Sequence, residues 1–370
     1  MYTFCLGPVC AEIPLTGTQL AFIWVAFPWV AGFSMLGVGE IFTRWRISRM
    51  FARSKIWTLL AILLIAMPAL AVSEAPWSDT GAYYDLSENS NTGCTEVSPR
   101  RTVTVGSGQR TPKLKMGGVV CVPKMKGFAG TGLDFDGSTH FLTSTLQTGT
   151  ADSNTLNKLV DSGGGFSGLV EVGDVAVDTD NDDQCVVTAV DSDTALSLDG
   201  DCFAAGSEAY DVQSGYFNIT AAITVGAWIR PTDVTSVSIV SKDDNTLKSY
   251  KLGIDGSSNA FFTIYDSNAA KTATSSITLV ASNAYFIVGT YDGANVLVSV
   301  SGATATTAYS GNIDDDSVQL EVGRRGDGAE DFDGVIDNVF VLSRAWNTGQ
   351  IQSFWHRLRA WEWYAKRGSQ

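Results

Sequence analysis

The sequence predicts a mainly β protein built as an antiparallel sandwich, with one solvent-facing side on each sheet. Between residues 216 and 344, short segments of alternating apolar and polar residues are separated by turns rich in Gly, Asn and Asp. Such alternation is typical of half-buried antiparallel strands. Charged residues make up only 17% of the chain, and the abundance of Gly, Ser, Thr, Asp and Ala favours turns and strands over helices.

Residues 1–75 differ from the rest because they hold two apolar runs, Leu20–Gly39 and Ile56–Val72. The first run is uncharged and long enough to cross a bilayer as a helix. Five basic residues separate the runs and predict a cytoplasmic loop, with the large C-terminal part outside; they are Arg44, Arg46, Arg49, Arg53 and Lys55.

The same residues also fit a secretory signal peptide that starts at Met50 and is cleaved after Ala71. The sequence does not decide between an anchored and a cleaved N-terminus. Both interpretations export the remainder, as a membrane-anchored extracytoplasmic domain or as a secreted protein.

The exported part begins with a predicted strand at 82–86, a strand and turn at 132–138 and a strand at 140–143. The alternating pattern then stops until residue 216, so residues 147–214 are predicted to form an inserted small β module, which a surface loop tolerates at low entropic cost. Further strands are predicted at 223–230, 238–241, 250–254, 261–265, 276–280, 285–291, 296–300, 318–323 and 335–342.

The period changes near the C-terminus, where Ile351, Trp355, Leu358 and Trp361 follow helical spacing. We expect a helix that docks on the sandwich; the alternative is a basic, Trp-rich helix that binds a membrane surface or a partner. The predicted domains are therefore 1–75, 76–146, 147–214, 215–345 and 346–370.

Cysteine usage agrees with export, because the exported part contains an even number of cysteines: Cys94, Cys121, Cys185 and Cys202. Three pairings are open. A hairpin centred between Asp193 and Thr194 would place Cys185 opposite Cys202, which favours that pair and leaves Cys94 with Cys121.

Three motifs carry a resemblance to a known family. They are Phe135-Asp136-Gly137-Ser138, Thr290-Tyr291-Asp292-Gly293 and Arg344-Ala345-Trp346-Asn347. They resemble the laminin-G-like, concanavalin A-like jelly roll, although Tyr285-Phe286 and Ser301 depart from its pattern. The insert is similar to small β modules of phage and bacterial surface proteins. The resemblance implies a binding module, with Ca²⁺ held by Asp136 and Asp337.

The formal net charge of −14 excludes nucleic acid as a partner, because phosphate binding requires clustered Lys and Arg. Exposed aromatic residues beside polar groups suit carbohydrate, and Tyr250, Tyr265 and Tyr291 are the candidate ligand contacts. We expect a non-catalytic recognition or adhesion module for carbohydrate or a surface protein, with the membrane contacted through the N-terminal apolar helices.

Two alternatives stay open. The first is a structural or decoration component of a phage-type particle or a cell surface, which the insert's resemblance motivates. The second is a divergent glycan-active enzyme, although the sequence lacks the Glu-x-Asp-x-x-Glu arrangement that would set carboxylates on one strand face.

Overall fold

The computed structural model describes residues 131–356 continuously and, before them, eight short strands. These are β1 (Tyr2–Leu6), β2 (Val9–Ile13), β3 (Gly81–Tyr84), β4 (Glu96–Val97), β5 (Val103–Val105), β6 (Gly108–Arg110), β7 (Leu114–Gly117) and β8 (Lys124–Lys126). The predicted apolar helices, Cys94, Cys121 and residues 357–370 lie outside the described residues. Of the helices within the described part, none has the length and apolar character needed to span a membrane.

The chain divides into two compact units, Met1–Ser73 and Glu74–Gln370. Within the first unit, β1 and β2 pair as an antiparallel hairpin with Cys5 opposite Cys10. The sequence pattern did not predict this hairpin.

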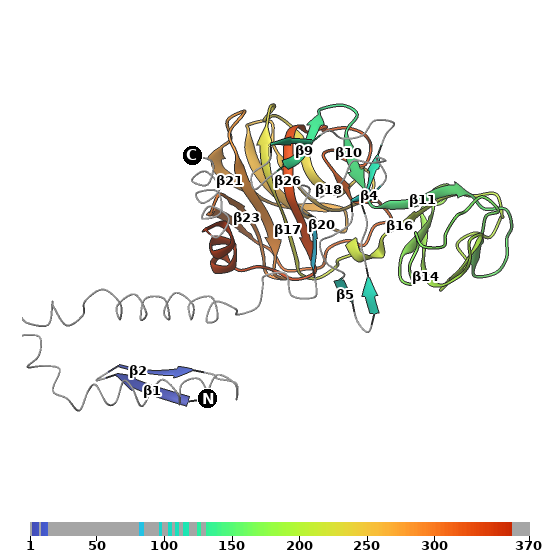
Figure 1. The fold of residues 1–370 in the computed structure, drawn as a ribbon, viewed down its shortest axis with the longest axis horizontal. Helices are drawn as coiled ribbons and strands as arrows, with labels where there is room; N and C mark the ends of the chain where they lie inside the picture. Colours follow the sequence, from blue (N-terminus) through green and yellow to red (C-terminus); the bar gives the residue numbers. More distant parts are fainter. Residues whose placement is uncertain are drawn as a thin grey trace, which may run out of the picture. The chain divides into compact units, whose positions relative to one another are not determined.

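The second unit contains two eight-stranded sheets (Figure 1). We call one of them the front sheet and the other the back sheet, as names only. The front sheet has the order β21-β20-β19-β18-β25-β10-β7-β4. Its strands in the continuous region are β10 (Phe141–Thr143), β18 (Val237–Asp243), β19 (Lys248–Ile254), β20 (Asn259–Asp266), β21 (Ala269–Thr278) and β25 (Glu321–Val322). All described pairings in it are antiparallel.

The back sheet has the order β24-β23-β22-β17-β26-β9-β8, and β3 also pairs with β26. Its remaining strands are β9 (Thr131–Asp136), β17 (Ile223–Pro231), β22 (Tyr285–Tyr291), β23 (Asn295–Val300), β24 (Ala303–Ala308) and β26 (Asp333–Leu342). These pairings are antiparallel as well. The predicted mainly β, antiparallel class is confirmed, and the arrangement is that of a jelly roll.

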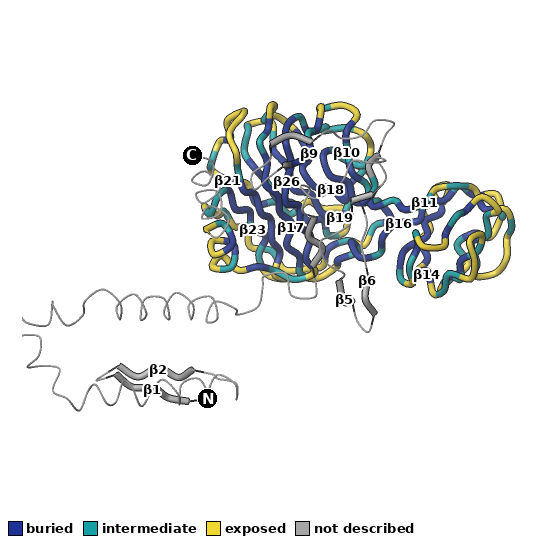
Figure 2. Tube along the Cα trace, in the orientation of Figure 1, coloured by how far each residue is buried: buried dark blue, intermediate teal, exposed yellow. Residues whose placement is uncertain are grey.

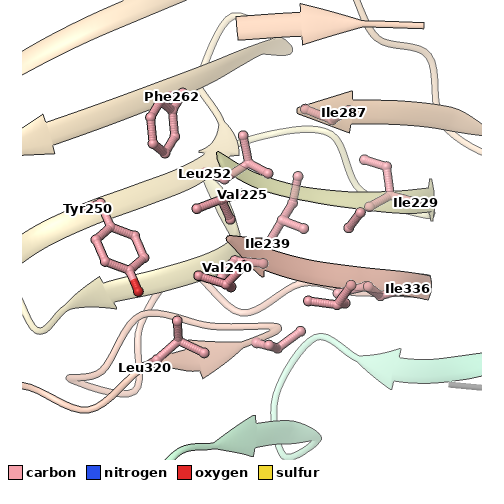
Figure 3. Packing of buried hydrophobic residues seen from close by; sticks show 14 of the residues in the cluster. Val225, Ile229, Ile239, Val240, Tyr250, Leu252, Phe262, Ile287, Leu320 and Ile336 are labelled. Carbon is pink, nitrogen blue, oxygen red and sulfur yellow. The ribbon is translucent and has the colours of Figure 1, made fainter. Parts of the chain in front are cut away.

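The core lies between the sheets, where alternate residues of each strand meet. Val225, Ile229 and Ile336 of the back sheet face Leu252 and Phe262 of the front sheet (Figure 3). All five are buried, and Figure 2 shows the same concentration of buried positions along β17 and β26. Burial on this scale supplies the dominant favourable free energy of such a sandwich.

The outer side of the back sheet is covered too. Trp228, Phe286 and Phe340 project from it and form a second buried cluster with Trp346 and Phe354. Residues 348–356 are helical, and this helix carries Ile351 and Phe354 into the cluster. The predicted C-terminal docking helix is confirmed over these residues.

Residues 145–213 form a separate six-stranded sheet, β11-β16-β13-β14-β15-β12, with its own hydrophobic cluster. The strands are β11 (Thr145–Thr150), β12 (Lys158–Val160), β13 (Val175–Asp178), β14 (Asp183–Ser192), β15 (Ala195–Leu198) and β16 (Ala209–Gln213). We call this module the insert. Its first and last strands pair with each other, so the chain enters and leaves at one place (Figure 1).

Cys185 and Cys202 of the insert form a disulfide, with their Cα atoms 6.1 Å apart. The predicted hairpin is present, and Ser192 pairs with Ala195 across the Asp193-Thr194 turn. However, two bulges shift the register, so that Val187 lies opposite Leu198. The strands therefore do not place the two cysteines directly opposite each other, and the chain beyond β15 brings Cys202 back to Cys185.

Candidate functional site

The outer side of the front sheet carries a network of charged and hydroxyl side chains. Alternation on β19 sends Tyr250 and Leu252 into the core and Lys251 to the opposite side. The segment 323–332, between β25 and β26, lies against β18, because Gly326 N–H donates to the Asp243 carbonyl and Ser238 N–H donates to the Glu330 carbonyl. We define the Lys251 network as Ser238, Asp243, Lys251, Tyr265, Arg325, Asp327 and Glu330.

Lys251 is the centre of this network. Its Nζ lies 3.2 Å from Asp243 Oδ2 and 3.2 Å from Glu330 Oε2. Tyr265 donates its hydroxyl hydrogen to Asp243 Oδ2 at 3.0 Å. One ammonium thus joins a carboxylate of the sheet to a carboxylate of segment 323–332.

Glu330 is held in a backbone conformation that disfavours its side chain. Its φ is +55°, and the other non-glycine residues with positive φ in the described part are all Asn, Asp or Ser. Asn and Asp adopt left-handed turns most readily, whereas Glu does so at a cost. The Glu330 carboxylate accepts hydrogen bonds from Ser238 Oγ at 2.7 Å and from Arg325. Strain of this kind concentrates at functional positions.

Arg325 completes the solvent-facing side of the network. Its Nε and Nη2 donate to the two oxygens of Asp327 at 2.9 and 2.7 Å. The hydrogen bond from Arg325 lowers the pKa of Asp327. Burial raises the pKa of Tyr265, and the neighbouring Asp243 carboxylate adds to that effect. The network therefore keeps Asp327 ionised and the Tyr265 phenol protonated at neutral pH.

A second ion pair lies beside the network on the same segment. Arg324 donates to Glu321 through Nε at 2.6 Å and Nη2 at 3.0 Å, and its guanidinium lies 3.2 Å from the centre of the Phe141 ring. Burial raises the pKa of Glu321, although Arg324 opposes the shift. This pair fixes the start of the segment that carries Arg325 and Glu330.

The three predicted ligand-binding tyrosines do not form a surface. Tyr250 and Tyr291 are fully buried, and Tyr265 is 8% exposed. Their hydroxyls donate to the Phe217 carbonyl, the Gly311 carbonyl and Asp243, respectively. The prediction was wrong for Tyr250 and Tyr291 because both point into the sandwich core; Tyr265 is on the outer side, but acts there by orienting Asp243.

The two predicted calcium ligands are not brought together. Asp136 on β9 lies opposite Asp333, whereas Asp337 lies opposite Trp228 and is buried. Four residues along β26 correspond to about 13 Å. In the described part of the chain, no group of three or more His, Cys, Asp or Glu side chains is arranged to hold a metal ion.

Asp136 instead stabilises its own turn. Its carboxylate accepts hydrogen bonds from the backbone N–H groups of Ser138, Thr139 and His140. Burial acts to raise its pKa, but these hydrogen bonds, with that of the Thr139 hydroxyl, outweigh it and lower the pKa well below the usual range.

Sequence reasoning did not identify Asp243, Arg325 or Glu330. The alternation of β19 gave one usable signal, because a Lys between Tyr250 and Leu252 must face away from the core. The contact between β18 and segment 323–332 joins residues that are far apart in the chain. No local pattern could have revealed it.

Comparison with known families matches residues 204–352 to the concanavalin A-like lectin/glucanases superfamily. This agrees with the resemblance to a laminin-G-like, concanavalin A-like domain expected from the motifs, over that part of the chain. No curated protein matches the chain.

Solved structures show distant likeness. Domain 4 of the extracellular arabinanase AbnA from Geobacillus stearothermophilus, in complex with arabinotriose, is 10% identical with a TM-score of 0.36, covering 74% of this chain and 96% of that one. Trypanosoma rangeli sialidase with the inhibitor DANA is 12% identical with a TM-score of 0.42, covering 78% and 34%. The binding domain of botulinum neurotoxin DC with SialylT is 11% identical with a TM-score of 0.32, covering 61% and 50%. The chain spans about a third of the sialidase's length.

Proposed function

We propose that the chain is a non-catalytic carbohydrate-recognition protein that binds its ligand at the Lys251 network and acts outside the cytoplasm. The observation that carries the proposal is the built polar network on the outer side of the front sheet. The match of residues 204–352 to a superfamily of lectins and glucanases supports the choice of carbohydrate.

The chemistry of the network suits a sugar. Saccharides present hydroxyl groups that both donate and accept, and apolar C–H faces that pack on rings. Arg325, Asp327 and Glu330 are partly exposed and provide charged donors and acceptors. Phe261 of β20 provides a ring on the same side of the sheet, with Lys251 Nζ 5.8 Å from its centre. Its neighbour across the ladder, Thr274, is exposed.

The arrangement of carboxylates favours binding over cleavage. Glycosidases need one carboxyl group that donates a proton and a second carboxylate across the scissile bond. Asp243 and Glu330 are near each other, but Lys251 lies between them and contacts both. An ammonium so placed occupies the space between the two carboxylates, where a glycosidase would hold the scissile bond.

Glycan-array screening of the full chain, followed by calorimetric titration of the best ligand, tests the proposal. We expect Glu330→Gln and Phe261→Ala to weaken binding roughly tenfold or more, because each removes a contact worth ~1.4 kcal/mol or more. Lys271→Met is the matched control, since Lys271 lies on β21 with its Nζ over the Tyr309 ring. Circular dichroism confirms that each variant is folded.

Three outcomes would change the proposal. Absence of any glycan ligand would overturn carbohydrate recognition and favour a surface protein as the partner. Equal binding by all variants would move the site away from the Lys251 network. Release of reducing sugar would show that the protein is catalytic.

Repeating the titration with Ca²⁺ and with a chelator, on the native chain and on Asp136→Asn, tests the calcium dependence expected from the sequence.

A further inference from the structure

The free edge of the back sheet has the features of an interaction surface. Strand β24, Ala303–Ala308, is the last strand of that sheet and pairs only with β23 among the described residues. Five of its six residues are exposed, and the sixth, Ala305, is half-buried against the core. An edge strand of this kind presents unpaired N–H and C=O groups along its length.

Proteins usually protect such an edge with a charge, a proline, a bulge or a covering segment. Strand β24 has the sequence Ala-Thr-Ala-Thr-Thr-Ala, without charge or proline. Its pairing with β23 runs over six consecutive residue pairs without a register shift. Among the described residues, the edge is therefore regular in register, uncharged and unpaired on its outer side.

The edge is also rigid. It begins after a two-residue turn in which Ser301 and Gly302 both have positive φ, as a tight hairpin requires. At its far end, the Tyr309 N–H donates to the Ala294 carbonyl. In between, the Thr307 hydroxyl donates to the Thr272 carbonyl of β21, at 2.9 Å. A preformed edge loses little conformational entropy when it binds.

We infer that β24 pairs antiparallel with β24 of a second copy of this chain, which continues the back sheet across a two-fold axis. Identical strands can pair antiparallel only about such an axis, and the interface is then self-complementary. Charge permits the same occupant: two copies with a net charge of −14 repel each other least where the contact itself carries no charge, and β24 carries none.

The side-chain pattern fits this pairing. Ala303, Ala305 and Thr307 lie opposite the core residues Val300, Val298 and Val296, so they face inward. Thr304, Thr306 and Ala308 therefore face outward. In a hairpin closed by a two-residue turn, the residues that flank the turn, here Val300 and Ala303, hydrogen-bond to each other. Alternate residues of β24, starting from Ala303, therefore bond to β23. The N–H and C=O groups on the free edge belong to Thr304, Thr306 and Ala308. A two-fold that pairs Thr304 with Thr306 of the other copy keeps threonine beside threonine.

Hydrogen–deuterium exchange of the full chain tests this inference at ~1 and ~200 μM, a range that brackets micromolar self-association. We expect peptides that cover 303–308 to exchange roughly tenfold more slowly at the higher concentration. Thr306→Lys should abolish the difference, because it places two like charges close together on the same face of the paired strands, one on each side of the axis. Thr188→Lys, on an exposed threonine of β14 in the insert, is the matched control and should retain it.

Because exchange is measured for each peptide, protection of 303–308 can be distinguished from association through the apolar N-terminal runs. Exchange of 303–308 that does not depend on concentration would overturn the inference. Protection that persists in Thr306→Lys would do the same. Protection that requires added lysate protein would show that the edge binds a different chain.

Discussion

Replacement of Lys242 tests how the fold tolerates a buried charge. Lys242 lies on β18 opposite Tyr250, is 1% exposed, and donates its Nζ hydrogen to the Asp316 carbonyl. Burial lowers its pKa from 10.5 to about 8, against the opposing influence of Asp315, Asp316 and Asp244. Because the folded pKa lies below the unfolded one, keeping this ammonium charged destabilises the folded state at neutral pH.

The sign and size of the effect follow from linkage. Between pH 8 and 10.5 the unfolded chain binds more protons at this position than the folded one, so stability rises with pH in that window. At ~1.36 kcal/mol per pKa unit, the gain from pH 7 to pH 9.5 is about 2 kcal/mol. The Lys242→Met variant lacks this titration. From pH 7 to pH 9.5 its free energy of unfolding should therefore rise by about 2 kcal/mol less than that of the native chain.

Urea unfolding followed by tryptophan fluorescence at pH 7, 8, 9 and 9.5 measures the difference between the native chain and Lys242→Met. The comparison removes titrations that both proteins share, such as those of the tyrosines. At pH 7 the variant should be as stable as the native chain or more so, since burying a methionine avoids the desolvation of an ammonium. Parallel pH profiles for the two proteins would refute the assignment of a depressed pKa to Lys242.

Three further predictions concern the insert and the core. Replacing Cys185 and Cys202 by Ala should lower the stability of the insert by about 3 kcal/mol, measured by calorimetry, because the disulfide closes a loop over a sequence separation of 17. Raising NaCl from ~10 to ~500 mM should raise the melting temperature of the insert, since residues 145–213 carry fourteen acidic residues against the single Lys158 and salt screens their repulsion. An unchanged melting temperature would show that the carboxylates are already neutralised. Tyr250→Phe should cost about 1 kcal/mol of stability through the lost hydrogen bond to the Phe217 carbonyl and leave ligand binding unchanged; weaker glycan binding would contradict its place in the core.

The sequence predicted several strands that pack on the core, but not the exposed edge strand of the back sheet. Residues 223–230, 285–291 and 335–342 fall on β17, β22 and β26, because burial imposes an apolar pattern on them. Strand β24 has no such pattern, since its residues are mostly exposed and small, and it was not predicted. An exposed edge strand is specified by its hairpin turn and its neighbour rather than by hydrophobic periodicity.

The candidate site was harder to predict than the fold for a related reason. Aromatic residues were taken as ligand contacts, yet Tyr250 and Tyr291 fill the core and bond to backbone carbonyls. The site residues Asp243 and Glu330 carry no local signature, because a long-range contact brings them to Lys251. The domain boundaries drawn from the sequence stay a prediction, although residues 145–213 form their own sheet and cluster.

The two sheets differ in a way that bears on function. The outer side of the back sheet is apolar and buried beneath Trp346 and Phe354, so both of its sides contribute to stability. The outer side of the front sheet holds charges at Asp243 and Lys251 that are almost fully removed from water. Paired charges in such a position are usually no more stabilising than apolar residues of the same size. Since stability alone does not account for them, and Glu330 adopts an unfavourable φ to complete the set, their presence supports a role in recognition.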